Sequence, residues 1–182
     1  MFVIRRLSAE DLDSVYLLFR SAFEKDHMYN EYNLDIANFE NIFKVAIDYS
    51  VLKGESFGVF LNNKLISFLL GFDYHKGFQN DKETMNQIFL MDLNGNSTFT
   101  EMKLFFEEAE KHDNLYYIMS IATSEEYRQQ GLARLLLDTV IKEINQDLIG
   151  DVSSMITMSM YEKRNFGIST LGEDYKMVLY NR

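Results

Sequence analysis

A tight turn between an apolar segment and an amphipathic segment is the part of this sequence best suited to chemistry. It reads Arg128-Gln129-Gln130-Gly131-Leu132-Ala133, and the apolar spacing after it predicts a helix that begins at the turn. The first N–H groups of a helix have no intrahelical partners, and the helix dipole places partial positive charge there. Because Gly131 and Ala133 are small and Arg128 is cationic, the turn predicts an anion site, most naturally for a phosphate group.

The pattern Arg-x-x-Gly-x-Ala follows the apolar strand predicted at 115–123, and Tyr127 precedes the arginine. This arrangement resembles the acyl-CoA signature of the GNAT superfamily of N-acetyltransferases. The resemblance implies acetyl-CoA as co-substrate, lying between the motif strand and a strand expected near 155–160. It implies that the cofactor contacts come from Ile121, Ala122, Thr123, Arg128, Gln129, Gln130, Gly131, Leu132, Ala133 and Arg134. The alternative is a helix start of purely structural meaning.

The resemblance also implies the chemistry of the transfer. In this family a backbone N–H on the motif strand polarises the thioester carbonyl, and an amine attacks directly. Freeing the lone pair of a lysine-like amine at pH 7 costs about 4.6 kcal/mol, so a base or a desolvating pocket is expected. The glutamate that some members place at the start of the motif strand is replaced here by Leu115. Glu125 and Glu126 are alternatives that fit solvated loop residues better, and the sequence identifies no base.

Tyr161 is the candidate general acid that would reprotonate the leaving thiolate. The segment Tyr161-Glu-Lys-Arg-Asn-Phe166-Gly resembles the family's Tyr-x-x-x-Gly-Phe, with Asn165 in place of glycine. This register makes 166–170 and 175–180 a closing hairpin. In a second register Asn165 begins a short helix and Tyr175 matches the phenylalanine, which leaves the acid position without a tyrosine. A tyrosine that only packs against the sheet is the structural alternative.

Composition limits the classes of function that remain. The 182 residues suit one domain, 1–182, and the absence of cysteine excludes disulfides and thiol catalysis. His27, His75 and His112 show no ligand spacing, so no metal is predicted. A net charge of −10 disfavours nucleic acid and anionic membranes as partners and could steer a cationic substrate, although solubility is the simpler explanation. The longest apolar run, 65–72, is too short to span a bilayer and no signal-peptide layout is visible, so a cytoplasmic location is predicted.

Periodicity and turn residues predict the elements that position these residues. Helices are expected at about 9–24, with Ser8 and Asp11 as a capping box, at about 35–52, and from Gly131 to about Leu148. In the last of these, Leu132, Leu135, Leu136, Val140, Ile144 and Leu148 are expected to face a sheet, and Gly150-Asp151 to end the helix. Strands are expected at 2–6, 57–61, 64–72, 115–123, 155–160 and 175–180, with Asn62-Asn63 forming a hairpin turn.

Residues 76–114 depart from the short strand connection that the GNAT fold places here. Helical spacing at 81–92 and 99–112, with a loop at 94–98, indicates an inserted pair of helices. In the second helix Met102, Phe105, Phe106 and Ala109 share one face. The insertion is expected either to cover the substrate or to serve packing or a homodimer contact.

We therefore expect an α/β (α+β) fold of GNAT type, a central mixed, mostly antiparallel sheet flanked by helices, with a helical insertion around 76–114. The expected function is acetyl transfer from acetyl-CoA to a primary amine in a ternary complex, the acceptor being a small molecule or a peptide. A regulatory module that binds acyl-CoA without turnover is the first alternative. An interaction domain without a CoA site is the second.

Overall fold

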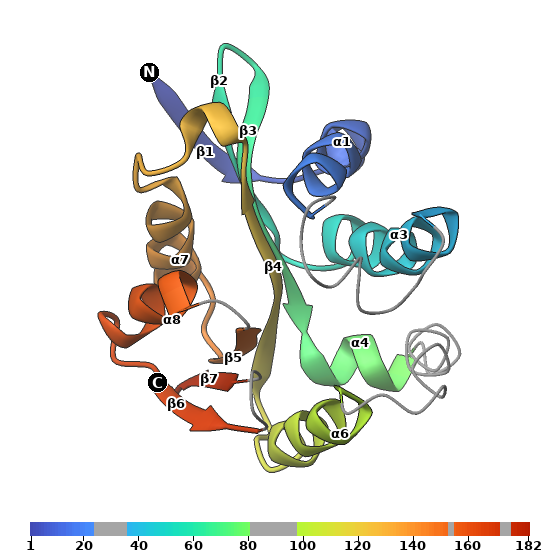
Figure 1. Ribbon diagram of the computed structural model, residues 1–182, viewed down its shortest axis with the longest axis vertical. Helices are drawn as coiled ribbons and strands as arrows, with labels where there is room; N and C mark the ends of the chain where they lie inside the picture. The colour runs from blue at the N-terminus through green and yellow to red at the C-terminus, as the bar shows by residue number, and fades with distance from the viewer. Residues whose placement is uncertain (24–35, 81–97, 153–154, 172–175) are drawn as a thin grey trace. The chain divides into compact units, whose positions relative to one another are not determined.

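The computed structural model describes residues 1–23, 36–80, 98–152, 155–171 and 176–182 (Figure 1). Its strands are β1 (Phe2–Arg6), β2 (Phe57–Leu61), β3 (Lys64–Asp73), β4 (Leu115–Thr123), β5 (Asp147–Val152), β6 (Gly167–Thr170) and β7 (Lys176–Tyr180). Its α-helices are α1 (Leu12–Phe23), α3 (Ile36–Leu52), α4 (Tyr74–Asn80), α6 (Thr98–Ala109), α7 (Leu132–Glu143) and α8 (Met155–Glu162), and the 3-10 turns are η1 (Ala9–Asp11) and η2 (Glu125–Tyr127).

The strands form one mixed sheet in the order β1-β2-β3-β4-β5-β7-β6. β4 and β5 pair in parallel, whereas β1–β2, β2–β3, β5–β7 and β6–β7 pair antiparallel. The predicted mixed, mostly antiparallel sheet flanked by helices is therefore confirmed. The contacts divide the chain into two compact units, residues 1–72 with 120–143 and residues 73–119 with 144–182.

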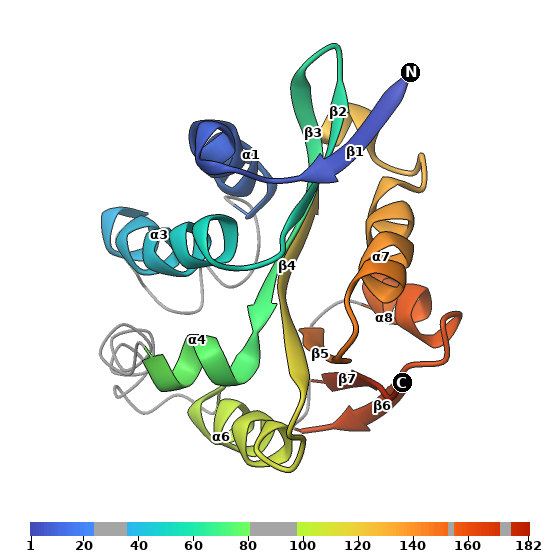
Figure 2. The same ribbon diagram turned by 180° about the vertical axis from the view of Figure 1, so that it is seen from behind.

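The first unit contains β1–β3, the end of β4, and helices α1, α3 and α7. Figures 1 and 2 show α1 and α3 on one side of its strands and α7 on the other. The predicted hairpin turn is confirmed, since Asn62 and Asn63 take φ values of 51° and 64°, which a two-residue turn between twisted strands requires. The Asp11 carboxylate accepts a hydrogen bond from Ser8 N–H at 2.9 Å, as the capping box predicts, and a second one from Ser8 Oγ at 3.1 Å.

The stripe that helix α7 buries differs from the predicted one on both sides of Leu136. Leu132, Leu136, Leu137 and Val140 are buried, whereas Leu135 is 39% exposed. Leu135 and Leu137 flank Leu136 on opposite sides, each about 100° around the helix axis. The buried stripe therefore extends to the Leu137 side of Leu136 and leaves the Leu135 side toward solvent.

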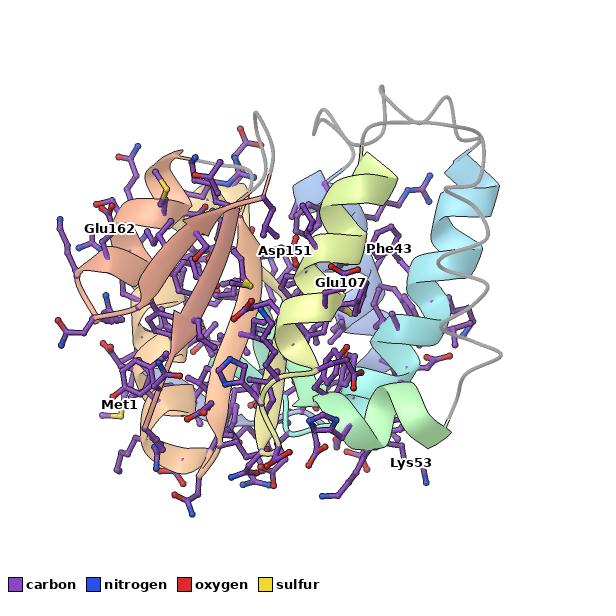
Figure 3. All side chains as sticks on the ribbon, turned by 90° about the horizontal axis from the view of Figure 1, so that it is seen from below. Met1, Phe43, Lys53, Glu107, Asp151 and Glu162 are labelled. Atoms are coloured by element: carbon purple, nitrogen blue, oxygen red, sulfur yellow. The ribbon has the colours of Figure 1, made fainter. Side chains whose placement is uncertain are left out.

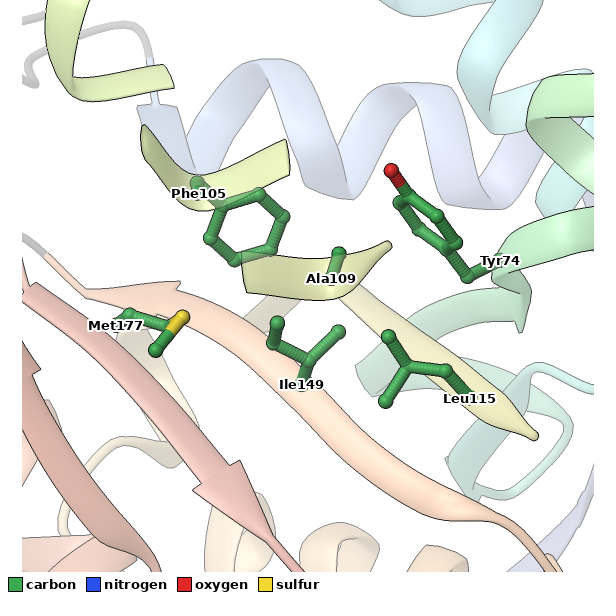
Figure 4. Close-up of a cluster of buried hydrophobic side chains, with 6 residues drawn as sticks. All are labelled: Tyr74, Phe105, Ala109, Leu115, Ile149 and Met177. Atoms are coloured by element: carbon green, nitrogen blue, oxygen red, sulfur yellow. The ribbon is translucent and has the colours of Figure 1, made fainter. Parts of the chain in front are cut away.

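The second unit contains α4, α6, the start of β4, β5, α8, β6 and β7. Its core is the cluster of six buried side chains drawn in Figure 4, which are Tyr74, Phe105, Ala109, Leu115, Ile149 and Met177. Phe105 and Ala109 come from α6, so the described second half of the insertion packs against β4, β5 and β7 within this unit. This supports the packing role among the two expected, while the predicted helix at 81–92 and residues 94–97 of the predicted loop lie outside the described residues.

The end of the chain corrects two predictions. The helix expected to run to Leu148 ends at Glu143, and Gly150 and Asp151 lie inside strand β5 instead of ending a helix. The strand expected at 155–160 is helix α8. The apolar residues Ile144 and Leu148 continue the helical spacing of α7. For this reason the spacing gave no sign that β5 begins at Asp147. Because β5 already occupies the position between β4 and β7, the 155–160 segment, whose three methionines favour a helix, is free to form one.

Candidate functional site

The turn that precedes α7 contains two residues in the left-handed backbone region. We call residues 128–134 the α7 turn. Gln129 and Gly131 take positive φ values of 63° and 80°, and Leu135 N–H donates to Gly131 O at 3.0 Å, which begins the helical hydrogen bonding. The side chain of Leu132 is buried and anchors the turn, whereas Arg128, Gln129 and Gln130 are exposed. A Cβ built on Gly131 would meet nothing within 4 Å, so the space beside this residue is open.

The α7 turn lies at the N-terminus of helix α7, where an anion is favoured. The first N–H groups of a helix have no intrahelical acceptor, and here the first turn of α7 contains no acidic residue. The helix dipole adds partial positive charge at the same end. An anion placed beside Gly131 would therefore find donors, a favourable field and room to approach.

The charged residues near the α7 turn are exposed. Arg128 Nε donates to Thr123 O at 3.4 Å, which ties the guanidinium to the end of β4. Arg134 is exposed on the first turn of α7. Glu125 and Glu126 are also exposed, and Glu126 lies 4.0 Å from Lys64 Nζ. The placement of both glutamates agrees with solvated loop residues.

The end of β4 is fixed by strand β3. Ser67 Oγ donates to Ala122 O at 2.8 Å and lies 2.8 Å from Thr123 Oγ1, and Ser124 N–H donates to Ile66 O at 2.9 Å. These bonds hold the strand residues expected to contact the co-substrate, Ile121, Ala122 and Thr123, in place before the turn.

The pairing of β4 with β5 covers only the first part of β4. It runs from Leu115–Asp147 to Ile118–Gly150, whereas β4 continues to Thr123. A Cβ on Gly150 would lie 3.3 Å from Ile118 O, so a glycine permits the close approach of the last pair. Beyond this pair Ser120 Oγ is buried and, within the described ranges, has no hydrogen-bond partner. No motif pointed to Ser120.

Tyr161 lies at the end of α8 and is 2% exposed. Its ring lies 5.0 Å from that of Phe166, in an edge-on arrangement. Burial, and then the negative charge of Asp151, raise the pKa of the Tyr161 phenol above its ordinary value. A phenol with an ordinary pKa is already protonated at neutral pH, and the raised pKa makes this proton harder to release.

The structure distinguishes the two registers considered for this segment. Asn165 follows α8 with φ of 62°, the left-handed conformation that glycine would otherwise take after a helix. Gly167–Thr170 and Lys176–Tyr180 pair antiparallel, so the predicted closing hairpin is confirmed. The second register, in which Asn165 begins a helix, is wrong.

Two side chains that the sequence did not indicate, Tyr117 and Asp151, interact electrostatically with Tyr161. Tyr117 Oη of β4 donates to Asp151 Oδ1 of β5 at 2.9 Å. Burial, followed by the charge of Asp151, raises the pKa of the Tyr117 phenol well above its ordinary value. We call Tyr117, Asp151 and Tyr161 the tyrosine–aspartate cluster. Sequence reasoning missed the pair because Asp151 was expected to end a helix; the parallel pairing of β4 with β5 would have revealed it.

In the part of the chain that the structure covers, no group of three or more His, Asp or Glu residues is arranged to hold a metal ion. His75 Nε2 lies 2.6 Å from His112 O, so these two histidines are near each other, whereas His27 lies outside the described residues. Among the described helices, none has both the length and the apolar character needed to cross a bilayer.

Several solved structures share the fold of this chain at low sequence identity. Drosophila melanogaster polyamine N-acetyltransferase, which forms N-acetylagmatine, is 10% identical over 100% of both chains, with a TM-score of 0.67. The PaiA N-acetyltransferase of Thermoplasma acidophilum, solved with coenzyme A, is 14% identical over 100% of this chain and 99% of the other, with a TM-score of 0.60. The Escherichia coli ribosomal-protein-S18-alanine N-acetyltransferase is 16% identical over 98% and 91%, with a TM-score of 0.55.

Sequence comparison gives the family. No match was found among curated protein sequences. The model of the acetyltransferase (GNAT) family matches residues 12–166, which include the α7 turn, the end of β4 and Tyr161. The chain therefore belongs to the GNAT acetyltransferase family.

Proposed function

We propose that this protein transfers an acetyl group from acetyl-CoA to a primary amine in a ternary complex. The observation that carries the proposal is the α7 turn, where positive φ values at Gln129 and Gly131 leave open space beside a helix N-terminus at the end of β4. Membership of the GNAT family supports the acetyl transfer, and the coenzyme A bound to the PaiA structure supports the co-substrate.

In this proposal the α7 turn binds the pyrophosphate of acetyl-CoA. Backbone N–H groups of Gln129, Gly131 and Ala133 would donate to it, flanked by Gln130 and Arg134. The backbone of Ile121, Ala122 and Thr123 would pair with the pantetheine arm as an added strand does. Support comes from the β4–β5 pairing, which ends at Ile118 and leaves these residues outside it.

Tyr161 is the proposed general acid. The amine nitrogen forms a bond to the acetyl carbon, the carbon–sulfur bond breaks, and the sulfur takes the phenolic proton of Tyr161, which solvent restores. Overall a protonated amine and acetyl-CoA give the amide, CoA with a free thiol and one proton. The left-handed Asn165 after α8 and the β6–β7 hairpin support this role, because they agree with the register in which Tyr161 matches the family's tyrosine. A phenol with an ordinary pKa of about 10 carries its proton at neutral pH.

The proposed acceptor is a cationic small molecule. The net charge of −10 favours the approach of cations. The neighbours named for polyamine and agmatine acetylation act on such amines, whereas the ribosomal-protein-alanine enzyme acts on a protein, so a peptide acceptor belongs in the test. A single domain over 1–182, a cytoplasmic location and a homodimer stay predictions.

The first test is the thermal unfolding of the purified protein with acetyl-CoA, with ATP and NAD as controls. A site with a Kd of about 10 μM, saturated at about 1 mM ligand, adds about 2.7 kcal/mol of stability. For a domain of this size the midpoint rises by about 5–10 °C. A shift with acetyl-CoA alone is expected, and no shift would leave the α7 turn a structural feature.

The second test is turnover. Release of the CoA thiol is measured with agmatine, spermidine, tyramine and a peptide with an N-terminal alanine as acceptors. Thiol release that depends on an amine supports the enzyme. Acetyl-CoA binding without turnover of any acceptor would favour the regulatory module that only binds acyl-CoA.

A further inference from the structure

Ser120 of β4 carries a buried hydroxyl that, within the described ranges, has no hydrogen-bond partner. Comparable groups elsewhere are paired. Ser67 Oγ donates to Ala122 O at 2.8 Å, and Tyr117 Oη donates to Asp151, which Figure 3 labels between the strands and α6. An unpaired buried hydroxyl costs stability, because it has lost its hydrogen bonds to water without replacing them. Ser120 therefore has a donor that a ligand can use.

The hydrogen bonds of β4 show which of its edges is open. Ser124 N–H donates to Ile66 O of β3 at 2.9 Å. Because the backbone groups of successive residues point to alternate edges of a strand, those of Ile121 and Thr123 point away from β3. On that edge β5 pairs with β4 only as far as Ile118. The N–H of Ile121 therefore faces the open edge.

Ser120 adjoins this N–H in the covalent chain. Only Cβ, Cα and the carbonyl carbon separate its Oγ from the nitrogen of Ile121, so one acceptor atom can receive hydrogen bonds from both groups. The residue is half-buried although its oxygen is covered. A serine side chain has three staggered rotamers, and no hydrogen bond within the described chain holds this one, so the hydroxyl can turn toward the exposed side. The strand thus offers a backbone donor and a side-chain donor at one point of its open edge.

We propose that the Ser120 hydroxyl, beside the N–H of Ile121, donates a hydrogen bond to the acetyl carbonyl oxygen of acetyl-CoA. The inference rests on the proposed function and adds a side chain to the recognition of the acetyl group. With the pyrophosphate at the α7 turn, an arm that pairs with Thr123 and Ile121 extends back along β4 toward Ile118, where β5 takes the edge. The thioester is at the far end of this arm from the pyrophosphate, so its carbonyl would come to the Ser120–Ile121 peptide.

A donor at this oxygen acts on both binding and turnover. CoA with a free thiol has no carbonyl there, so the hydroxyl distinguishes acetyl-CoA from the product. The oxygen gains negative charge while the amine attacks, so a hydrogen bond to it strengthens in the transition state. Because the hydroxyl is unpaired within the described chain, binding forms a hydrogen bond without breaking one there.

The first test compares the affinities of Ser120→Ala and wild type for acetyl-CoA and for CoA by titration calorimetry, without an amine. We expect the Kd for acetyl-CoA to rise by about 3- to 10-fold, the value of a hydrogen bond between neutral groups. The Kd for CoA should stay within about two-fold, because CoA lacks the acceptor oxygen. Equal changes for the two ligands would overturn the inference, since they would reflect the shape of the strand and not the acetyl group.

The second readout is kcat with the best acceptor of the amine panel. Ser120→Ala removes a donor to the oxygen that gains charge, so kcat should fall by about 100-fold. The KM for the amine should stay within about two-fold, because the hydroxyl contacts the acetyl group. Ser120→Thr keeps a hydroxyl and suits a strand, so it should keep the ratio of the two affinities near that of wild type. If Ser120→Ala does not fold, Ser120→Cys, whose thiol is a weak donor, carries the same test.

Ser67→Ala is the matched control, because it removes a buried serine hydroxyl that is paired. Ser67 Oγ donates to Ala122 O and lies 2.8 Å from Thr123 Oγ1, so its loss should lower the unfolding midpoint and weaken acetyl-CoA and CoA binding equally. Ser120→Ala should not lower the midpoint of the free protein, since no hydrogen bond is lost. A midpoint that falls as far as in Ser67→Ala would show that the Ser120 hydroxyl is paired without a ligand, which contradicts the inference.

The failures of the two proposals are distinct. A wild type that binds acetyl-CoA and acetylates an amine, together with an unchanged affinity ratio and kcat in Ser120→Ala, rules out the inference alone. A wild type that binds neither acetyl-CoA nor CoA rules out the α7 turn as their site, and the inference falls with the proposed function. Acetyl-CoA binding without turnover rules out only the acetyl transfer, because the ratio of the two affinities still measures the hydroxyl.

Discussion

The α7 turn and the tyrosine–aspartate cluster are built in opposite ways. The α7 turn is a run of consecutive residues whose useful groups are backbone N–H donors, exposed beside a glycine with open space around it. The tyrosine–aspartate cluster takes one side chain each from β4, β5 and α8, and Tyr161 is almost fully buried. One site depends on backbone conformation, whereas the other depends on individual side-chain atoms.

This difference determines how each region should respond to substitution. Because the proposed donors belong to the backbone, we expect most side chains of the α7 turn to change without loss of acetyl-CoA binding, and a side chain that fills the open space to abolish it. In the tyrosine–aspartate cluster the removal of a single oxygen is enough to change the chemistry while the packing stays the same. The comparison is therefore tested by two kinds of substitution, one that fills the open space of the α7 turn and one that removes an oxygen from the cluster without changing its packing.

The largest effect is expected from Gly131→Phe. A side chain there fills the open space, and loss of two charge-assisted hydrogen bonds weakens acetyl-CoA binding by more than about 100-fold. Because Gly131 has a φ of 80°, the substitution also costs about 1–3 kcal/mol of stability. Titration calorimetry with acetyl-CoA measures the loss. Gly167→Phe is the matched control, since a Cβ there would meet only Leu179 O at 3.7 Å, and retained binding in Gly131→Phe would contradict a site at the turn.

A smaller effect, on turnover alone, is expected from Tyr161→Phe. The ring that packs on Phe166 remains, so the fold is kept, but the proposed acid is lost and kcat falls by about 100-fold. The KM for acetyl-CoA should not change. Tyr180→Phe is the control, because Tyr180 also packs on Phe166, at 5.1 Å between ring centroids. Equal kcat values for the two variants would leave Tyr161 a packing residue.

Arg128→Gln should have a modest effect. Its exposed guanidinium contributes charge to a site made mainly of backbone donors, so the KM for acetyl-CoA should rise by about five-fold, and less at high salt. Lys142→Gln at the other end of α7, with a side chain 82% exposed, should leave the KM unchanged. A loss of acetyl-CoA affinity as large as that expected for Gly131→Phe would show that the charge of Arg128, and not the backbone donors, dominates binding at the α7 turn.

The smallest effect concerns stability at alkaline pH. The raised pKa values of Tyr117 and Tyr161 mean that the folded protein keeps phenolic protons that the unfolded chain loses above about pH 10. The free energy of unfolding should therefore fall as pH rises from that value, by at most about 1.4 kcal/mol per pH unit for each phenol. Urea unfolding between about pH 9 and 11 should show a weaker dependence for Tyr161→Phe than for wild type. Parallel curves would contradict a raised pKa.

The local parts of the fold could be predicted from sequence because their causes are local. The hairpin turn at Asn62-Asn63, the first helix with its Ser8–Asp11 cap, and strand β4 follow from residues a few positions apart. The positive φ values at Gln129 and Gly131 lie in the segment that the motif marked. Errors arose where two patterns overlap, as at Leu148, which continues the spacing of α7 but belongs to β5.

The sequence by itself determined the family, the turn before α7 and most of the elements, since helix starts, turns and apolar periodicity are read along the chain. The tertiary structure alone decided that β4 pairs with β5 only up to Ile118, that α6 packs into the second unit's core, and that Tyr117 reaches Asp151. These are contacts between segments far apart in the chain, and Tyr117 and Asp151 are 34 positions apart. Such contacts depend on strand order and register, which the burial of apolar side chains between the sheet and its helices fixes and no local pattern specifies.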